Sequence, residues 1–367
     1  MLCYNYTMFK LNKSAGNGQL DFLAIGDITI DAFIHLATGA EGSAVHSICT
    51  DADKEHCELC LPFPDKIPFD KMIEVKGVGN SANAAVSAAR LGLRSALITN
   101  VGGDSRGQDC INELKKNNVF ADFVAVEKGS ETNYHYALWF ETDRTILIKH
   151  HEYSYSLPEK LKNLKQAPRW MYLSSLASNS FNYHVEIIDY LKKNPSMKLA
   201  FQPGTFQMKL GTEKLAELYR RTDVFIVNVE ESRLILNTKE EGLDVLLNGI
   251  YKLGPKIVLI TDGPNGAYMH DGERSYFMPI YPDMKPPYER TGCGDAFAST
   301  FIAALAMGKS PLEALLWAPI NSMSVVEYVG AQEGLLTRPA LEDFLKKAPA
   351  DYKPVPYNAF LESQHKK

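Results

Sequence analysis

Apolar and amphipathic segments alternate along most of the chain. The first apolar run, 21–30, is rich in β-branched residues and predicts a buried strand that ends near Asp27 and Asp31. Farther along, short apolar runs and segments of helical period follow one another, which indicates a mostly parallel sheet covered by helices on both faces. The expected strands are 95–100, 170–174, 198–202, 224–228 and 257–261, and the expected helices are 81–91, 108–117, 183–193, 213–220 and 243–253. The fold class is therefore α/β.

Two segments interrupt this alternation. Residues 37–70 are rich in Gly, Pro, Asp and Cys and show little periodicity, which is typical of an insertion. Residues 122–149 alternate apolar and polar side chains around a turn at 141–144, and this pattern predicts an antiparallel hairpin. We expect both excursions to pair into a small β subdomain. The predicted division is a core of 21–30, 77–120 and 151–367, and a β lid of 31–76 and 121–150 that carries the cysteine-containing insertion.

Composition and charge argue against several function classes. The 367 residues are 45% hydrophobic and 23% charged, as in ordinary globular proteins. The net charge of −5 provides no basic field for binding nucleic acid. The best apolar run, 296–307, is shorter than the roughly 20 residues that span a bilayer, so we expect no membrane partner. Residues 1–20 lack the apolar region of a secretory signal, and we expect a partly disordered leader on a cytoplasmic protein.

The segment ERTGCGDAFASTFIAALAMG at 289–308 carries the clearest chemical pattern. Gly292 and Gly294 free the backbone to turn, and a long apolar helix begins at once with Asp295 in its first turn. Unpaired amides at a helix N-terminus bind anions, so a phosphoryl group can lie on Gly292, Cys293 and Gly294. Asp295 at the same place can accept a proton from an attacking hydroxyl. Taken alone, the same residues can also be a plain turn followed by a helix-start acid.

Two motifs in this order resemble those of a known family. TGCGDAF at 291–297 is similar to the C-terminal signature of the ribokinase-like (PfkB) carbohydrate kinases, whose usual form is T-G-A-G-D. GVGNSANAAVSAARLG at 77–92, followed by NVGGDSRG at 100–107, resembles the N-terminal signature of the same family. The resemblance extends through GDITID at 26–31, NVEE at 228–231 and TDGPNGAY at 261–268.

The resemblance implies a fold and a reaction. The fold is a three-layer α/β/α domain with a mostly parallel central sheet and a small β-sheet lid. The reaction is transfer of the γ-phosphate of ATP to a hydroxymethyl group of a sugar, as in ribokinases and fructokinases. Mg²⁺ is the expected metal, and a monovalent cation such as K⁺ is a further candidate cofactor. A homodimer formed through the lid is also in keeping with the resemblance.

The resemblance assigns roles position by position. Asp295 is the implied catalytic base, and the amides of Gly292, Cys293 and Gly294 are the implied anion hole for the transferred phosphoryl group. The acceptor hydroxyls are assigned to Asp31, Gly79, Asn80 and Asn83. The nucleotide side is assigned to Asn228, Glu231, Thr261, Gly263, Gly266 and Asn321, with Glu231 also organising water molecules on Mg²⁺. Asn83 can instead be a capping residue, Glu231 a solvated helix acid, and Asn321 a residue outside the adenine pocket.

Three departures from the signatures bear on specificity. Val78 replaces the first glycine of G-G-x-x-x-N, Cys293 replaces the signature alanine, and Arg290 stands where a small or polar residue is usual. Cys293 contributes its backbone amide, so the anion hole survives, although its thiol can make the enzyme sensitive to alkylation. Arg290 can reach either ATP or an anionic substrate, which leaves the substrate class open.

The predicted hairpin is expected to select the acceptor. Alternation places Asn133 and His135 on one face and Tyr134 and Tyr136 on the other. We predict that the Asn133 and His135 face meets the acceptor, because polar groups suit a sugar. The aromatic face would suit a base, so a nucleoside kinase of the adenosine or cytidine type is the alternative. A kinase-shaped protein that binds its ligand without turnover is more remote, because Asp295 is retained.

The glycines at 77–82 also fit the dinucleotide-binding pattern G-x-G-x-x-A, and a predicted helix follows them. A true fingerprint places an acidic residue at the end of the next strand, but that strand ends in Asn100. The sequence contains no G-x-x-x-x-G-K-[ST] motif either. Neither hydride transfer nor P-loop chemistry is therefore favoured.

A cluster of cysteines and histidines lies in the insertion. Cys49, Cys57 and Cys60, with His46 and His56, could supply ligands for a tetrahedral zinc ion. Their spacing is irregular, and in a reducing cytoplasm the thiols can equally be small buried side chains. We expect a structural role or none for this cluster, away from catalysis.

Overall fold

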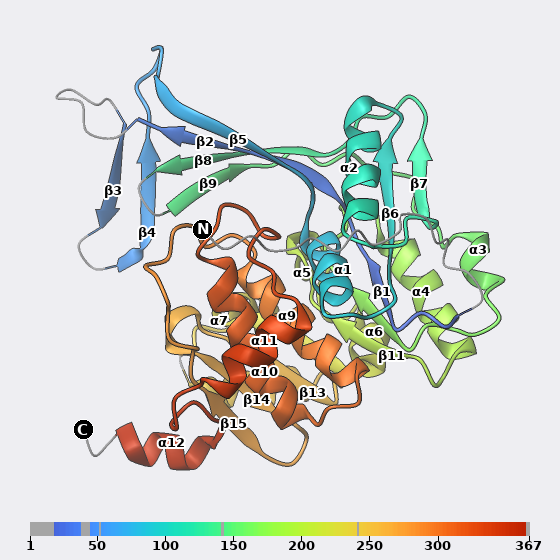
Figure 1. Cartoon of the computed structure of the whole chain (residues 1–367), viewed down its shortest axis with the longest axis vertical. Coiled ribbons are helices and arrows are strands. Elements are labelled where there is room, and N and C mark those ends of the chain that lie inside the picture. Colours follow the sequence, from blue (N-terminus) through green and yellow to red (C-terminus); the bar gives the residue numbers. More distant parts are fainter. Residues whose placement is uncertain (1–17, 38–44, 51–52, 141–142, 241, 365–367) are drawn as a thin grey trace.

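A parallel sheet forms the centre of the structure, which is a computed structural model describing residues 18–37, 45–50, 53–140, 143–240 and 242–364 (Figure 1). Adjacent strands from β7 to β13 run parallel, and those from β13 to β16 run antiparallel. In spatial order the strands are β16 (Val355–Pro356), β15 (Ser275–Met278), β14 (Ala267–His270), β13 (Ile257–Thr261), β12 (Val224–Asn228), β11 (Lys198–Phe201), β10 (Trp170–Leu173), β1 (Phe22–Ile25), β6 (Ser95–Gly102) and β7 (Val124–Glu127). The predicted mostly parallel sheet is confirmed.

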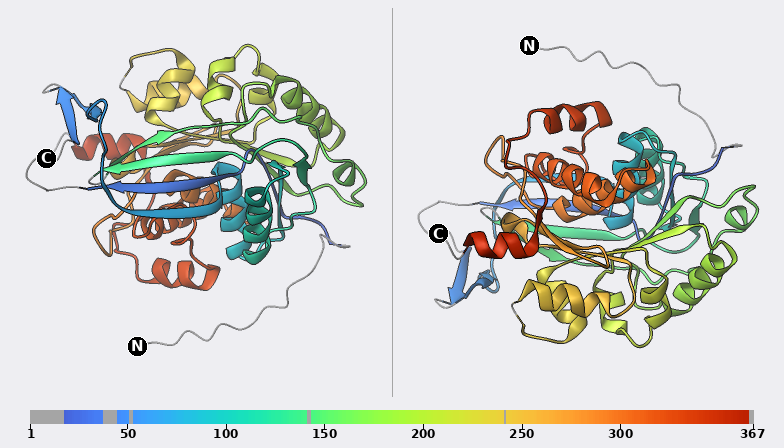
Figure 2. Two further views of the ribbon diagram at one scale, coloured as in Figure 1. Left: turned by 90° about the horizontal axis from the view of Figure 1, so that it is seen from above. Right: turned by 90° about the horizontal axis from the view of Figure 1, so that it is seen from below.

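Helices cover both faces of this sheet (Figure 2). Alternate residues of β1 divide between two apolar cores, Phe22 and Ala24 in one and Leu23 and Ile25 in the other. One core packs on α1 (Asn80–Arg90), α2 (Ser105–Lys116), α9 (Cys293–Ala306), α10 (Pro311–Val325) and α11 (Arg338–Lys346). The other packs on α3 (Glu159–Lys162), α4 (Phe181–Lys193), α5 (Thr205–Leu210), α6 (Ala216–Arg221), α7 (Val229–Leu236), α8 (Leu243–Tyr251) and α12 (Tyr357–Gln364). The three-layer α/β/α arrangement is confirmed, and no helix among the described residues could cross a bilayer.

A second sheet, here called the small sheet, lies beside the central one (Figure 1). Its strands, in spatial order, are β5 (Phe69–Val78), β2 (Thr29–Leu36), β8 (Tyr134–Phe140) and β9 (Asp143–Leu147). The β8–β9 pair is the predicted antiparallel hairpin, whereas β2 and β8 run parallel, so the sheet is mixed. The insertion is not irregular throughout, because β3 (His46–Thr50) and β4 (Asp53–Cys60) form a separate antiparallel hairpin.

The apolar run 21–30 is not the single strand that its composition predicts. Its first half is β1 in the central sheet, and its last residues begin β2 in the small sheet. Gly26 lies between them, and a Cβ there would come within 2.8 Å of the Ser175 carbonyl oxygen. The chain therefore changes sheets at a point where another backbone packs closely. Residues 1–17 of the predicted leader lie outside the described residues, while Leu20 is buried in the core.

Candidate active site

The predicted anion hole is the N-terminus of α9. Gly292 precedes the helix with φ 80°, and a Cβ there would lie 2.1 Å from the Cβ of Ala331. The first helical hydrogen bond runs from the Ala296 amide to the Gly292 carbonyl at 2.8 Å, so the amides before Ala296 have no partner within the helix. A Cβ on Gly294 would meet no atom within 4 Å. The first turn of α9 therefore opens onto free space where an anion can bind.

Asp295 is buried at this turn and is held by two side-chain amides. Its Oδ2 accepts a hydrogen bond from Asn83 Nδ2 at 2.8 Å, and its Oδ1 accepts one from Gln202 Nε2 at 3.2 Å. Burial raises the pKa of Asp295, and the negative charge of Asp31 raises it further, while the two hydrogen bonds oppose the shift. A fixed carboxylate with a raised pKa is suited to accept a proton from an alcohol.

A second layer of hydrogen bonds fixes these two amides. Gln332 Nε2 donates to Asn83 Oδ1 at 3.0 Å and to the Gly77 carbonyl at 2.8 Å. The hydroxyl of Tyr172 donates to Gln202 Oε1. Asn83, predicted to bind acceptor hydroxyls, thus has its amide engaged on both sides and orients Asp295. Sequence reasoning did not single out Gln202, which it took as the last residue of a strand.

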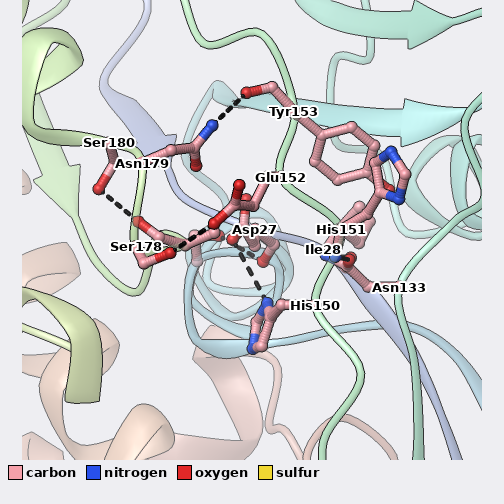
Figure 3. A network of polar contacts seen from close by, with 12 residues as sticks. Asp27, Ile28, Asn133, His150, His151, Glu152, Tyr153, Ser178, Asn179 and Ser180 are labelled. Atoms are coloured by element: carbon pink, nitrogen blue, oxygen red, sulfur yellow. Dashed lines mark hydrogen bonds and ion pairs between the residues drawn. The ribbon is translucent and has the colours of Figure 1, made fainter.

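A cluster of buried polar side chains, here called the polar cluster, lies near Asp295, and the charge of one member, Asp31, raises the pKa of Asp295. The carboxylate of Asp31 and the imidazole of His135 face each other from neighbouring strands, with Oδ1 and Nδ1 3.3 Å apart. Nδ1 of His150 lies 3.6 Å from Asp27 Oδ2. Figure 3 marks this contact with a dashed line. Among the described residues, Asp31 Oδ1, His135 Nε2 and His150 Nδ1 are buried and make no hydrogen bond. Groups of this kind are ready to bind the hydroxyls of a ligand.

Asp27 and His150 were not predicted as site residues. The hydroxyl of Tyr155 donates to both carboxylate oxygens of Asp27, at 2.8 and 3.0 Å. The rings of His135 and His150 lie 5.1 Å apart. Of these side chains only His135 was predicted to meet the acceptor, and Asp27 was noted in the sequence only for its place near a strand end.

Asn133, Gly79 and Asn80 were also predicted to bind the acceptor. Asn133 is 1% exposed, and its amide donates to the Ile28 carbonyl at 3.2 Å and accepts from the His151 amide at 2.7 Å. Gly79 has φ 113° at the start of α1, where a Cβ would lie 2.8 Å from the Asp27 carbonyl oxygen. Asn80 is the half-buried first residue of α1. The structure thus brings Asp31 and His135 together and gives Asn133 partners within the protein.

The predicted phosphate-side pair forms a capping box at the start of α7. Asn228 Oδ1 accepts from the Glu231 amide at 2.7 Å, and Glu231 Oε2 accepts from the Asn228 amide at 2.9 Å. Burial raises the pKa of Glu231, and the charge of Asp295 raises it further, although the hydrogen bond from Asn228 opposes the shift. Glu231 is therefore a half-buried carboxylate near Asp295 and not a solvated helix acid.

The remaining nucleotide-side residues lie at two places. Thr261 ends β13, and Gly263 and Gly266 lie in the turn to β14, with φ 49° and 103°. Asn321 is fully buried, and its amide donates to Thr300 Oγ1 at 2.8 Å and accepts from the Leu336 amide at 2.9 Å. Asn321 thus has partners within the protein on both sides, whereas the turn at Gly263 is open.

Two sequence hypotheses concern thiols. Burial raises the pKa of Cys293, so the reactive thiolate is disfavoured and the expected sensitivity to alkylation is not supported. In the β3–β4 hairpin the backbone register pairs Cys49 with Cys57 and His46 with Cys60. The side chains of Cys49, His56 and Cys57 lie outside the described residues, and the described residues alone contain no group that could hold a metal ion. A zinc site there stays a prediction.

A helix N-terminus with free amides, a buried carboxylate in its first turn and a polar cluster near it form the arrangement expected of a phosphoryl-transferring enzyme. Residues 63–338 match the pfkB family carbohydrate kinase, and the chain belongs to this family.

Relatives and solved structures agree with this membership. The chain is 25% identical over 299 residues to a probable chloroplastic fructokinase-6 of Arabidopsis thaliana, with 74% of each chain covered. It is 25% identical over 272 residues to a ribokinase of Bacillus subtilis, which covers 73% of this chain and 87% of the relative. The structure of Arabidopsis thaliana ribokinase complexed with ribose and ATP matches with a TM-score of 0.71 at 19% identity, covering 90% of this chain and 99% of its own. The fold is that of the ribokinases.

Proposed function

We propose that this carbohydrate kinase transfers the γ-phosphate of ATP to a hydroxymethyl group of a ribose- or fructose-like sugar, with Asp295 as the catalytic base. The supporting observation is the position of Asp295. Its carboxylate belongs to the first turn of α9 and is close enough to Asp31 of the polar cluster for their charges to interact. A hydroxyl held by Asp31 and a phosphoryl group held by α9 would thus meet at one carboxylate.

Each part of the site has one task in this mechanism. Asp295 takes the proton of the attacking hydroxyl, and the amides of Cys293 and Gly294 stabilise the negative charge on the phosphoryl oxygens. Asp31 and His135 orient the acceptor. The small sheet serves as the lid, and its closure excludes water that would otherwise be phosphorylated in place of the sugar.

ATP and Mg²⁺ are the proposed cofactors. Carboxylate oxygens are the ligands that Mg²⁺ prefers, usually through bound water molecules, and Glu231 is a half-buried carboxylate near Asp295. Bound Mg²⁺ would neutralise charge on the phosphates of ATP. Thr261, Gly263 and Gly266 would border the nucleotide, because the turn after β13 leaves open space. We also propose that a monovalent cation such as K⁺ activates the enzyme. Exchanging the alkali chloride in the assay measures how activity depends on this cation.

The acceptor is identified by a substrate panel. Buried oxygen and nitrogen atoms of Asp31, His135 and His150 that make no hydrogen bond favour a compact polyol. Coupled measurement of ADP release with D-ribose, D-fructose, adenosine and cytidine tests this. We expect turnover with ribose or fructose. ADP release with none of these acceptors, although ligands bind, would favour a non-catalytic homologue.

One observation keeps a nucleoside as the second candidate acceptor. The half-buried ring of Phe206 lies against His150, with ring centroids 5.7 Å apart in an edge-to-face arrangement. An aromatic side chain beside the polar cluster could pack on a nucleobase. Turnover of adenosine or cytidine well above that of ribose and fructose would establish this alternative.

Replacing Asp31 by alanine is expected to weaken acceptor binding more than catalysis. We predict a rise in acceptor KM of about ten- to a hundredfold with a smaller change in kcat, since a hydrogen bond to a charged group contributes about 1.5–3 kcal/mol. Asp70→Ala is the matched control, because Asp70 also pairs with a histidine of β2, His35 at 3.0 Å, but is half exposed. An unchanged KM in Asp31→Ala would remove Asp31 from the acceptor site.

We also propose a homodimer formed through the outer face of the small sheet. Met72, Tyr136 and Leu147 lie on this face and are 53%, 41% and 51% exposed. Exposed apolar side chains of this kind favour a second copy related by a two-fold axis, and light scattering measures the molar mass. The net charge of −5 disfavours nucleic acid as a partner. We further propose that the protein acts on small molecules in the cytoplasm and has no membrane partner.

A further inference from the structure

Glu289 is a buried carboxylate at the base of the loop that leads to the anion hole. It is 1% exposed. Its Oε1 accepts hydrogen bonds from the backbone amide of Thr291, at 2.8 Å, and from the hydroxyl of Thr291. Its Oε2 accepts from the Gly330 amide at 3.3 Å. Glu289 therefore fixes the residue immediately before Gly292 and ties it to the segment after α10.

The positive partner of this carboxylate comes from the small sheet. Nε of Arg144, on β9, lies 3.3 Å from Glu289 Oε1. This Nε is buried and makes no hydrogen bond to any described residue, so its contact with Glu289 is a charge pair. A carboxylate removed from water is costly without a compensating charge. The guanidinium of Arg144, on the small sheet, thus stabilises the buried carboxylate of Glu289, which precedes α9.

Neighbouring contacts join the same two places. Trp139 is opposite Arg144 in the β8–β9 register, and its ring packs edge-on against Tyr288 at 5.3 Å. Lys71 of β5 donates to the Tyr288 hydroxyl at 2.9 Å. The end of the small sheet therefore packs on Tyr288 and Glu289, the first two residues of the segment 288–292, here called the anion-hole loop.

The charge of Arg144 also reaches the first turn of α9. It lowers the pKa of the Cys293 thiol, against the larger opposing effects of burial and of Asp295. Glu289 and Asp295 are both carboxylates. The phosphoryl group that would bind between α9 and Asp31 carries negative charge as well. A guanidinium beside this loop offsets part of that charge.

We propose that Arg144 is a positioning residue for phosphoryl transfer, which acts through Glu289 to set the anion-hole loop when the small sheet is closed over the site. The inference rests on the proposed function. It assigns to the small sheet a direct part in forming the phosphoryl site, beyond covering the acceptor. Arg144 itself need not contact the substrate.

Arg144→Gln tests the proposal by separating catalysis from binding. We expect kcat to fall about a hundredfold, the loss typical of slight misplacement of reacting groups, while the acceptor KM changes by a few fold at most. Guanidinium ion added at non-denaturing concentration should restore part of kcat. Arg106→Gln is the matched control, because Arg106 packs on Tyr134 of the same sheet, 4.2 Å from the ring centroid, away from Glu289. A wild-type kcat in Arg144→Gln, or a loss equal to that of Arg106→Gln, would overturn the proposal.

A binding measurement distinguishes failure of this inference from failure of the proposed function. MgADP with aluminium fluoride mimics the transferred phosphoryl group, and calorimetry measures its binding without any acceptor. We expect Arg144→Gln to weaken binding of this complex and to leave binding of MgADP alone unchanged. Equal affinities in both proteins contradict the role of Arg144, whatever the acceptor panel shows. If Arg144→Gln is unstable, Arg144→Lys is measured in the same way, and full wild-type binding and kcat with lysine would contradict a role for the guanidinium geometry.

Discussion

Asp295→Asn is expected to lower kcat by about 10²- to 10⁴-fold, the contribution typical of a general base. The asparagine keeps the size and polarity of the side chain but cannot accept the proton of the acceptor hydroxyl. We expect kcat and kcat/KM to fall together, because the interaction is used in the transition state. Steady-state rates with the acceptor found in the panel provide the measurement. Asp189→Asn, on the exposed side of α4, is the control for the same chemical change.

The stability of Asp295→Asn should not fall with its activity. Burial raises the folded-state pKa of Asp295 above its ordinary value, so the folded protein binds this proton more tightly than the unfolded chain. Its contribution to stability is therefore fully present below the ordinary pKa and is lost as the pH rises through the raised pKa. Asparagine removes the cost of burying this charge but turns an amide donor toward one of the two fixed amide donors, so Tm should stay near that of the wild type. A variant retaining more than about a tenth of wild-type kcat, with chemistry rate-limiting, would remove Asp295 as the base.

Alanine at two glycines of the anion hole is expected to change Tm differently, although activity should fall in both variants. Gly294→Ala should leave Tm unchanged or slightly higher, because its Cβ meets open space and alanine favours a helix by about 1 kcal/mol. Activity should nevertheless fall by about 10²- to 10³-fold, the effect of losing an oxyanion contact, because the first-turn Cβ points toward the phosphoryl site. Thermal unfolding and kcat/KM are measured on the same preparations.

Gly292→Ala should instead lose stability. Its left-handed backbone costs an alanine about 1–2 kcal/mol. The new methyl would also overlap Ala331, and overpacking of this kind costs about 1–3 kcal/mol more. We therefore expect a lowered Tm together with loss of activity.

The activity of the other variant tests where the phosphoryl group binds. Full activity in Gly294→Ala would show that no phosphoryl group occupies the space in front of Gly294.

The parts of the site formed by consecutive residues could be predicted from the sequence. Gly292 to Asp295 contain both the turn and the helix start, so their chemistry depends on local backbone geometry alone. The βα alternation likewise predicted the three layers, since each short apolar run can be buried only inside a covered sheet. Asp31 and His135 followed from a resemblance and from strand alternation, and they face each other in the structure.

Contacts that depend on the spatial order of the strands, or on how the two sheets pack, could not be predicted from the sequence. Gln202 contacts Asp295 only because the ends of the central strands lie beside the first turn of α9. Arg144 reaches Glu289 only because the small sheet rests on the anion-hole loop. No periodicity in the chain encodes such packing between units. The change of sheet at Gly26 was missed for the same reason, since it depends on the close approach of Ser175.

The fate of the γ-phosphate of ATP tests the central claim most directly. Wild-type protein is incubated with γ-labelled ATP, Mg²⁺ and ¹³C-labelled D-ribose or D-fructose. Coupling between carbon and phosphorus, measured by NMR, then shows which carbon of the sugar carries the transferred phosphate. The account predicts ADP and sugar phosphate in equal amounts, with the phosphate on the oxygen of a hydroxymethyl carbon. Label found only in inorganic phosphate, or on a ring hydroxyl, would contradict the account.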